Sequence, residues 1–271
     1  MQLIITPTDF SPASRNACFY AAKMAEAVHA RLLLVHVVEL PVAITEFSEV
    51  VDMTEATGAK PRLQELLDAL CLETNNNIDI EAAIVSGHLE KELTELCNHK
   101  KPFAVVMATN SHSAFERFFE GSTTGYASRH LHFPVIVVPA TAQYKPVNKI
   151  ALASDLKNLD AMPAHEIETI VKSFSAELEI FHVSKQWQAA NDNSVSELFE
   201  QLLPNISFKF YCTQNDDILT AISSLNRAHD IDMLIVIPGK QNLFHKSQSG
   251  NFIFNGHIPT IALHANDFMK A

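Results

Sequence analysis

Glycine is scarce in this chain of 271 residues, which contains only seven glycines, where an average usage of about 7% would give roughly 19. Few loops can therefore adopt positive φ angles or let a ligand approach the backbone closely. This scarcity argues against a site built on a glycine-rich phosphate loop. The sequence contains neither a Walker A loop nor a GxGxxG motif, and it lacks the GxSxG elbow of many hydrolases.

Positive charge and long apolar runs are scarce as well. The chain has 20 Lys and Arg residues against 31 Asp and Glu residues, and its formal net charge is -11. Nonspecific binding to nucleic acid needs clustered cations, so this charge argues against a nucleic-acid partner. No apolar run reaches the roughly 20 residues of a membrane-spanning helix, and the residues that follow Met1 carry no early basic cluster. We therefore expect neither a membrane span nor a secretory signal.

Cysteine is limited to four residues, none of which forms a CxxC pair. They are Cys18, Cys71, Cys97 and Cys212. Three of them fall in helical patterns, where a buried thiol is the usual interpretation. A chain without a disulfide framework fits a reducing compartment, and we expect a cytoplasmic protein.

The chain does contain a long internal repeat. The segment IITPTD, which ends at Asp9, returns as IALASD, which ends at Asp155, and LVHV around His36 returns as IFHV around His182. Both pairs are 146 positions apart. Solenoid repeats have periods of roughly 20–50 residues, so this spacing indicates a duplicated domain. Each half can then be judged separately for a functional site.

Both halves alternate short apolar segments with amphipathic helical patterns. The predicted strands are 3–7, 31–38, 78–85, 103–108 and 134–139 in the first half and 150–154, 178–183, 208–212, 232–237 and 259–263 in the second. Ser11 before Pro12 marks the start of the first helix, and Ser194 is expected to cap a later one. The alternation predicts an α/β fold of two tandem Rossmann-like domains, each a five-stranded parallel sheet with helices on both faces. The predicted domains are residues 1–142 and 149–271.

In such sheets, ligands bind beyond the carboxyl ends of the strands, at the topological switch point. Asp9 follows the first predicted strand, and Val37 lies near the end of the second. Ala108 ends the fourth predicted strand, with Ser111 shortly after it. These residues are therefore expected to meet at one edge of the first sheet.

The string PTDFS, which begins at Pro7, resembles the first-strand signature of the universal stress protein family. The strand end at Val37, a Gly-Ser pair at 121–122 ahead of a helix, and a last strand that opens with proline also fit this family. The resemblance covers nearly the whole chain as two tandem copies. It implies the adenine nucleotide α-hydrolase-like form of the fold, with the halves packed about a pseudo-twofold axis where strands 134–139 and 259–263 meet.

Nucleotide-binding members of this family carry a spaced glycine motif: glycine, two residues, glycine, nine residues, then glycine with Ser or Thr. The glycines let backbone amides approach the phosphates, and the closing pair places a hydroxyl and a helix N-terminus at the anion. Here the spacing is kept, but Ala108 and Ser111 replace the first two glycines, while Gly121 and Ser122 are kept. The corresponding residues of the second half are Ile237, Lys240, Gly250 and Asn251.

The resemblance implies an ATP or AMP site in the first half. Its residues are Pro7, Thr8, Asp9, Val37, Ala108, Ser111, Gly121, Ser122 and Thr123. By the resemblance, Asp9 accepts a hydrogen bond from the adenine amino group, Val37 contacts the adenine ring, and Ser122 and Thr123 contact phosphate. Structural roles compete with these assignments, because Asp9 can orient the loop ahead of Ser11 and Ser122 can cap the following helix.

Histidine and lysine offer further candidates for a site. The chain has 13 histidines, but His130 and His132 are two positions apart at a predicted helix end and point in different directions. His36 and His182 are expected to make local hydrogen bonds, because they recur in both halves. We interpret the basic loop at Lys240 as solvated, with attraction of an anion as the alternative. No metal ligand is assigned.

The sequence leaves three functions open. The first is a non-catalytic stress-response protein that acts through unidentified protein partners and keeps a degenerate nucleotide site, which the loss of glycine favours. The second is an ATP or AMP sensor that uses the first half, with at most weak ATP hydrolysis, which Asp9, Gly121 and Ser122 favour. The third is a metal-binding accessory protein. We expect an intramolecular pseudo-dimer of the two halves, with a further homodimer left open.

Overall fold

The computed structural model describes residues 1–39, 58–109, 123–154, 156, 159–184, 192–216, 218–237 and 258–265. The elements of the first half are β1 (Leu3–Pro7), α1 (Pro12–Ala27), β2 (Arg31–Val38), α3 (Ala59–Glu73), β3 (Ile80–Ser86), α4 (Leu89–Lys100), β4 (Ala104–Thr109), α6 (Thr123–His130) and β5 (Val135–Pro139). Those of the second half are β6 (Lys149–Ser154), the 3-10 helix η2 (Leu159–Ala161), α7 (Ala164–Phe174), β7 (Glu177–Ser184), α8 (Asp192–Leu202), β8 (Phe208–Gln214), α9 (Ile218–Ala228), β9 (Met233–Val236) and β10 (Thr260–Ala262).

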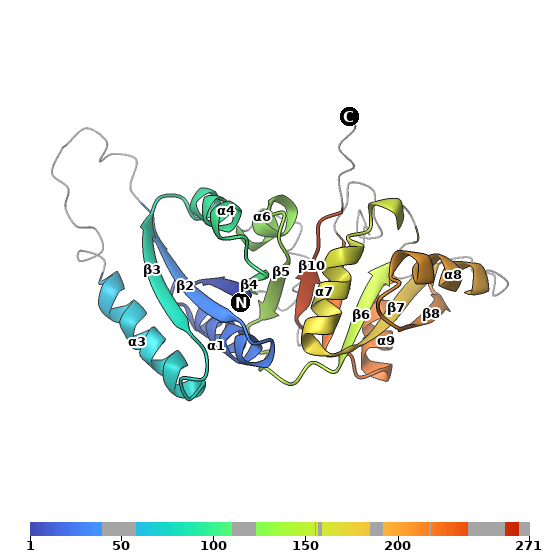
Figure 1. Cartoon of the computed structure of the whole chain (residues 1–271), viewed down its shortest axis with the longest axis horizontal. Helices are drawn as coiled ribbons and strands as arrows, with labels where there is room; N and C mark the ends of the chain where they lie inside the picture. The colour runs from blue at the N-terminus through green and yellow to red at the C-terminus, as the bar shows by residue number, and fades with distance from the viewer. Residues whose placement is uncertain are drawn as a thin grey trace.

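The described strands form one ten-stranded sheet in the order β3-β2-β1-β4-β5-β10-β9-β6-β7-β8 (Figure 1). Neighbouring strands are parallel within each half, whereas β5 and β10 pair antiparallel, with Val137 opposite Thr260 and Val135 opposite Ala262. The predicted meeting of strands 134–139 and 259–263 is thereby confirmed. Replacing β1–β5 by β6–β10 reproduces the order read from the other end, as a pseudo-twofold axis requires.

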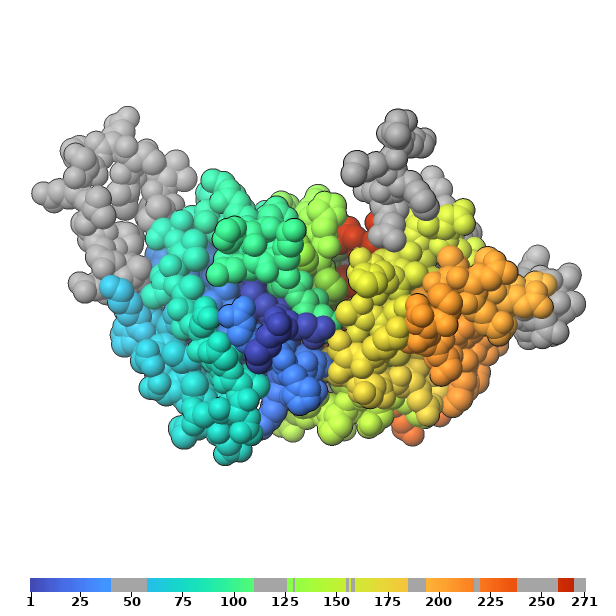
Figure 2. All heavy atoms as spheres, viewed as in Figure 1, coloured from blue at the N-terminus to red at the C-terminus, as the bar shows by residue number. Residues whose placement is uncertain are grey.

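The inner strands of the sheet are mostly buried on both faces, which explains their continuous apolar runs, whereas the outermost strands β3 and β8 are half-buried or exposed. Along β1, Ile4 packs into the core on one face and Ile5 into the core on the other. Helices α1, α3, α7 and α8 cover the first face, and α4, α6 and α9 cover the second. Each of the two cores contains residues from both halves, so each core is continuous across the sheet. The two halves lie side by side (Figure 2).

The start of α1 follows the sequence prediction. Ser11 is extended, and its side-chain oxygen accepts a hydrogen bond from the Ser14 amide at 3.2 Å. Pro12 occupies the first turn, where its missing N–H needs no partner. The prediction for α8 is wrong: this helix begins at Asp192, so Ser194 lies in its first turn and is not its N-cap. Residues such as Asp and Asn favour helix N-termini as strongly as serine does, which allows the earlier start.

The linker between the halves is fastened to α1. Asn16 Nδ2 donates hydrogen bonds to the carbonyl oxygens of Pro139 and Ala142, at 3.3 and 2.8 Å. The rings of Tyr20 and Tyr144 meet edge to face, with centroids 5.2 Å apart. These contacts hold the connection between β5 and β6 against the first half.

Two cysteines are buried as the helical pattern predicts. Burial raises the pKa of the Cys18 thiol to about 11 and that of the Cys97 thiol to about 12. At neutral pH both are therefore protonated and poor nucleophiles. Cys71 and Cys212 are half-buried, and none of the four cysteines, which all lie in the described residues, forms a disulfide.

Candidate functional site

The carboxyl ends of β1, β2 and β4 lie at one edge of the first sheet. In the sheet β1 lies between β2 and β4, so the chain continues from β1 to the neighbour on one side and later returns to the neighbour on the other side. This edge is therefore the topological switch point, where open α/β sheets bind ligands. Pro7 ends β1, Val37 lies near the end of β2, and Ala108 lies near the end of β4. The structure therefore brings these three predicted residues to the same edge.

Polar side chains hold the turn that follows β1. The Thr8 hydroxyl oxygen accepts a hydrogen bond from the Phe10 amide at 3.0 Å and lies 3.1 Å from the Ser14 hydroxyl. Asp9 Oδ1 accepts a hydrogen bond from the Ser11 amide at 2.9 Å. Between these bonds Phe10 adopts a φ of 64°, a left-handed conformation that is unusual for a bulky residue. The hydrogen bonds on either side of Phe10 stabilise this conformation.

Asp9 is exposed at this edge. Partial burial acts to raise its pKa, but hydrogen bonds from Ser11 and Ser14 outweigh that effect and hold the pKa below its usual value. The side chain is therefore a carboxylate at neutral pH and can only accept hydrogen bonds. Its bond to the Ser11 amide matches the structural role expected for Asp9, while its contact with adenine stays a prediction.

A group of stacked side chains packs against the same turn. Phe10 is 7% exposed, and its ring centroid lies 4.4 Å from that of His36 and 4.3 Å from the Arg62 guanidinium carbon. His36 Nδ1 donates to the Thr8 carbonyl oxygen at 2.8 Å, so this nitrogen carries the proton. The end of β2 and the first turns of α3 are thus tied to the loop that presents Asp9.

The second half builds its turn in the same way. The Ser154 hydroxyl accepts a hydrogen bond from the Leu156 amide at 3.2 Å, and Leu156 has a φ of 58°. His182 Nδ1 donates to the Ser154 carbonyl oxygen at 2.9 Å. The prediction that His36 and His182 make local hydrogen bonds is confirmed. The turn is therefore a repeated structural unit of both halves.

The structure describes only part of the predicted phosphate side. Ser111, Gly121 and Ser122 lie outside the described residues, and Thr123 is the first residue of α6. Ala108 lies in the regular part of β4, opposite Val138 of β5. The arrangement of these residues around a phosphate stays a prediction.

Three residues that shape the turn were not predicted from the sequence: Phe10, Ser14 and Arg62. A left-handed residue is normally signalled by Gly, Asn or Asp, and Phe10 gives no such signal. Ser14 faces the turn because it lies one helical turn after Ser11, which is a spacing that could have been noticed. Arg62 reaches Phe10 from α3, and no sequence spacing connects these two residues.

Neither a membrane span nor a metal cluster is found in the described part of the chain. No helix there is long and apolar enough to cross a bilayer. The same residues contain no group of three or more His, Cys, Asp or Glu side chains that could hold a metal ion. The described residues therefore provide no structural support for the metal-binding hypothesis.

Comparison with known proteins decides the family. The model of the universal stress protein family matches residues 1–139. The chain belongs to the universal stress protein family. A search of curated proteins found no significant match.

Solved structures of universal stress proteins share the fold. One from Archaeoglobus fulgidus DSM 4304 aligns over 98% of this chain and 97% of its own, with a TM-score of 0.70 at 16% identity. A candidate universal stress protein from Pseudomonas aeruginosa UCBPP-PA14 aligns over 98% and 94%, with a TM-score of 0.55 at 11% identity. A universal stress protein in complex with cAMP aligns over 51% and 96%, with a TM-score of 0.42 at 24% identity. The two alignments over the full chain confirm the α/β fold.

Proposed function

We propose that this universal stress protein acts in the cytoplasm by binding protein partners, is not an enzyme, and carries a degenerate nucleotide site in its first domain. The proposed domains are residues 1–142 and 149–271. The observation that carries this proposal is the recurrence of the Asp9 turn in the second half, around Leu156. In that half, Ile237 and Lys240 occupy the glycine positions of the nucleotide motif. The requirements of folding therefore suffice to explain the shape of the turn, without a role in nucleotide binding.

The phosphate side of the first site also favours this proposal. Ala108 occupies the first glycine position and keeps a regular strand register with β5. Its β-carbon stands where the glycine of nucleotide-binding relatives lets a phosphate approach the backbone. Ser111 replaces the second glycine. With both glycines replaced, the site has fewer backbone positions that a polyphosphate can approach closely.

An ATP or AMP sensor that uses the first domain is the second candidate, and the state of Asp9 favours it. This side chain is exposed, and hydrogen bonds from Ser11 and Ser14 keep its pKa low. A carboxylate at the switch point is suited to accept a hydrogen bond from an adenine amino group. Gly121 and Ser122 preserve the closing part of the motif.

Phosphate release from ATP tests the two candidates. We would compare the wild type with Asp9→Ala and with the matched variant Asp155→Ala in the second half. The interaction role predicts the same background rate for all three proteins. Hydrolysis that Asp9→Ala abolishes and Asp155→Ala preserves would establish the first-domain nucleotide role instead. Equal loss in both variants would contradict any model with a single site.

A further inference from the structure

β7 carries a buried carboxylate at a position where the first half has an apolar residue. Glu179 is 2% exposed, and Leu33, which lies 146 positions earlier and is the matching residue of β2, is 5% exposed. Burying a carboxylate carries a desolvation cost, and replacing a buried charged pair by apolar residues is often neutral or stabilising. The fold that the two halves share therefore does not require Glu179.

The partner of Glu179 is also specific to the second half. The helices α4 and α9 correspond, because Lys101 and Asp230, which follow them, both have positive φ angles, of 48° and 54°. The residue before each of these is Lys100 in the first half and His229 in the second. The turn after β1 recurs in both halves, whereas this pair occurs in only one. A role besides folding is therefore open to it.

The hydrogen bond between the two side chains fixes the tautomer of the neutral histidine. His229 Nδ1 donates to Glu179 Oε2 at 2.6 Å, so Nδ1 carries the proton and Nε2 keeps its lone pair. The side chain of His229 is 20% exposed. Nε2 makes no hydrogen bond to a described residue, and it does not belong to the described buried polar atoms that lack a partner. This nitrogen therefore reaches the surface.

Two aromatic rings hold the imidazole in place. It packs edge to face against Phe181 and Tyr211, with ring centroids 5.3 and 4.3 Å apart. When Nε2 forms a bond to an electrophile, the ring gains positive charge, which the hydrogen-bonded Glu179 carboxylate stabilises. Histidine is among the residues that form covalent bonds in this way. The pair thus presents an oriented nucleophilic nitrogen at the surface of the second half.

Two lysines bring positive charge to the same cluster. Lys149 Nζ donates to the His229 carbonyl oxygen at 2.9 Å. Lys209 of β8 lies opposite Glu179 in the sheet and pairs with Glu177 at 3.0 Å. A group that adds negative charge to the imidazole therefore has cations in its neighbourhood.

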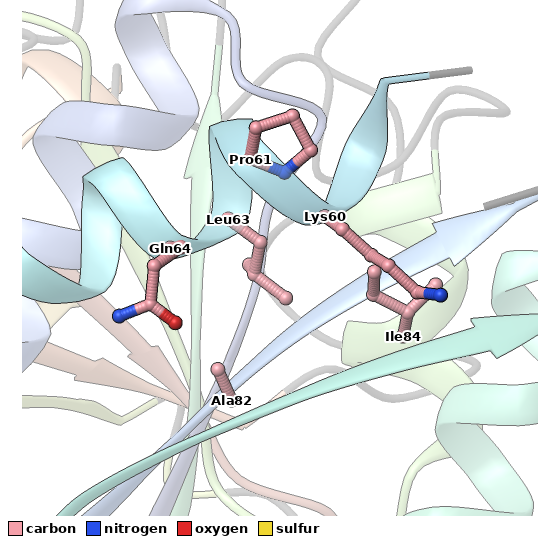
Figure 3. A pocket seen from close by; sticks show the side chains of 6 residues that line it. All are labelled: Lys60, Pro61, Leu63, Gln64, Ala82 and Ile84. Carbon is pink, nitrogen blue, oxygen red and sulfur yellow. The ribbon is translucent and has the colours of Figure 1, made fainter. Parts of the chain in front are cut away.

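Metal binding by Nε2 would need further ligands, and the described residues contain no group of three or more His, Cys, Asp or Glu side chains that could supply them. The depression of about 480 Å³ between α3 and β3 offers no comparable nucleophile. Its described lining residues are Lys60, Pro61, Leu63, Gln64, Ala82 and Ile84, and Figure 3 shows Leu63 reaching from α3 toward Ala82. The reactive nitrogen of His229 is thus suited to a single covalent bond.

We propose that His229 Nε2 accepts a phosphoryl group from small acyl phosphates. The Nε2 lone pair forms the bond to phosphorus while the bond between phosphorus and the acyl oxygen breaks, and the carboxylate leaves with that electron pair. The Nδ1 proton stays in its hydrogen bond, so the ring becomes a cation beside Glu179. The phosphoryl group adds negative charge in the neighbourhood of Lys149 and Lys209, which an acyl group would not do. This modification goes beyond the proposed function and does not involve the edge that carries Asp9.

Acetyl phosphate is the probe for this reaction. It would be added to the full chain at neutral pH, and the products followed by mass spectrometry of the protein and its peptides without acid, because the N–P bond is acid-labile. We expect one phosphoryl group at His229, with His29 and His99 labelled at least about tenfold more slowly. Both of these histidines are exposed, and neither ring is bonded to a carboxylate of the described residues, so they are controls within the same molecule.

Three variants test the role of the carboxylate. Glu179→Gln keeps an acceptor for Nδ1 but removes the charge, and it should slow labelling of His229 by about tenfold or more. The matched control Glu177→Gln removes the carboxylate that pairs with Lys209 and should label like the wild type. His229→Asn keeps a donor for Glu179 and should abolish incorporation at this position. Circular dichroism would verify that each variant is folded.

Three results would overturn the proposal. They are labelling of His229 no faster than that of His29 and His99, acetyl transfer to His229 in place of phosphoryl transfer, and wild-type labelling of Glu179→Gln. The comparison among histidines of the wild type decides the matter even where Glu179→Gln fails to fold. None of these results depends on the ATP hydrolysis assay, so failure of this inference is distinguishable from failure of the proposed function.

Discussion

Replacing His229 by alanine should destabilise the second half strongly. His229 follows α9, and its Nδ1 donates to Glu179 Oε2 at 2.6 Å. The Glu179 side chain is only 2% exposed, and that of His229 is 20% exposed. The imidazole also packs edge to face against Phe181 and Tyr211, with ring centroids 5.3 and 4.3 Å apart. Truncation to alanine would leave the Glu179 carboxyl buried in β7 without this partner.

The burial of Glu179 determines how much stability His229→Ala is expected to lose. Removing one partner of a buried pair costs about 3–5 kcal/mol, and we take about 3 kcal/mol because His229 retains some solvent contact. In proteins of roughly 150–250 residues each 1 kcal/mol lowers the melting midpoint by about 2–4 °C. We therefore predict a fall of about 6–12 °C for His229→Ala.

Differential scanning calorimetry would measure the effect, with a double variant as the control. Glu179→Leu combined with His229→Ala removes the buried carboxyl as well as its partner, so it should recover much of the lost stability. Two results would refute the reasoning. One is a loss within about 0.5 kcal/mol for His229→Ala, as for a surface substitution. The other is a double variant that is as unstable as the single one.

Further predictions concern the turn after β1 and its copy. Ser11→Ala should cost about 1 kcal/mol by removing the α1 cap, seen as a lower urea midpoint at unchanged slope; an unchanged midpoint would contradict the capping role. Folding lowers the pKa of Asp9, so the charged side chain stabilises the folded protein. This contribution is fully present above the usual aspartate pKa of about 3.9 and is lost as the pH falls through the lowered pKa. The stability difference between the wild type and Asp9→Asn should shrink over that range, and a difference that grows there would be inconsistent with this sign. His36→Ala and His182→Ala should each cost about 0.5–1.5 kcal/mol in urea unfolding, and a large effect from one alone would argue against equivalent turns.

The order of elements along the chain and the seam between the halves could be predicted because they depend on regular patterns. The recurrence of His36 as His182 fixes the offset of the two copies, and strand periodicity gives each copy the same order of elements. The family resemblance then implies that the last strands meet. In the structure these strands do meet, with Val137 opposite Thr260. Periodicity and duplication constrain many residues together, which makes such predictions robust.

The Glu179 and His229 pair could not be predicted in the same way. Glu179 lies between Leu178 and Ile180 in an apolar strand, and its partner comes from the end of a distant helix. Pattern analysis places each residue in its element, but gives no distance between side chains that are far apart in sequence. Only the packing of α9 on β7 brings this donor to the carboxyl.

The candidate site was predictable in part. The strand pattern placed Pro7, Asp9 and Val37 at or just beyond the carboxyl ends of their strands, and the structure does so too. The left-handed turn at Phe10 was not foreseen, because its stability comes from hydroxyl groups and from packing on Arg62. Sequence therefore identified the edge of the sheet but not the contacts that shape it.

A thermal melt with and without Mg-ATP or AMP tests the degenerate nucleotide site most directly. A ligand at 100 times its dissociation constant adds about 2.7 kcal/mol to the free energy of unfolding, which corresponds to a rise of roughly 5–11 °C in a protein of 150–250 residues. We predict that millimolar Mg-ATP or AMP leaves the midpoint within about 1 °C of the ligand-free value, well below that rise. A rise of several degrees that Asp9→Ala abolishes would contradict this prediction and show that the first domain still binds nucleotide.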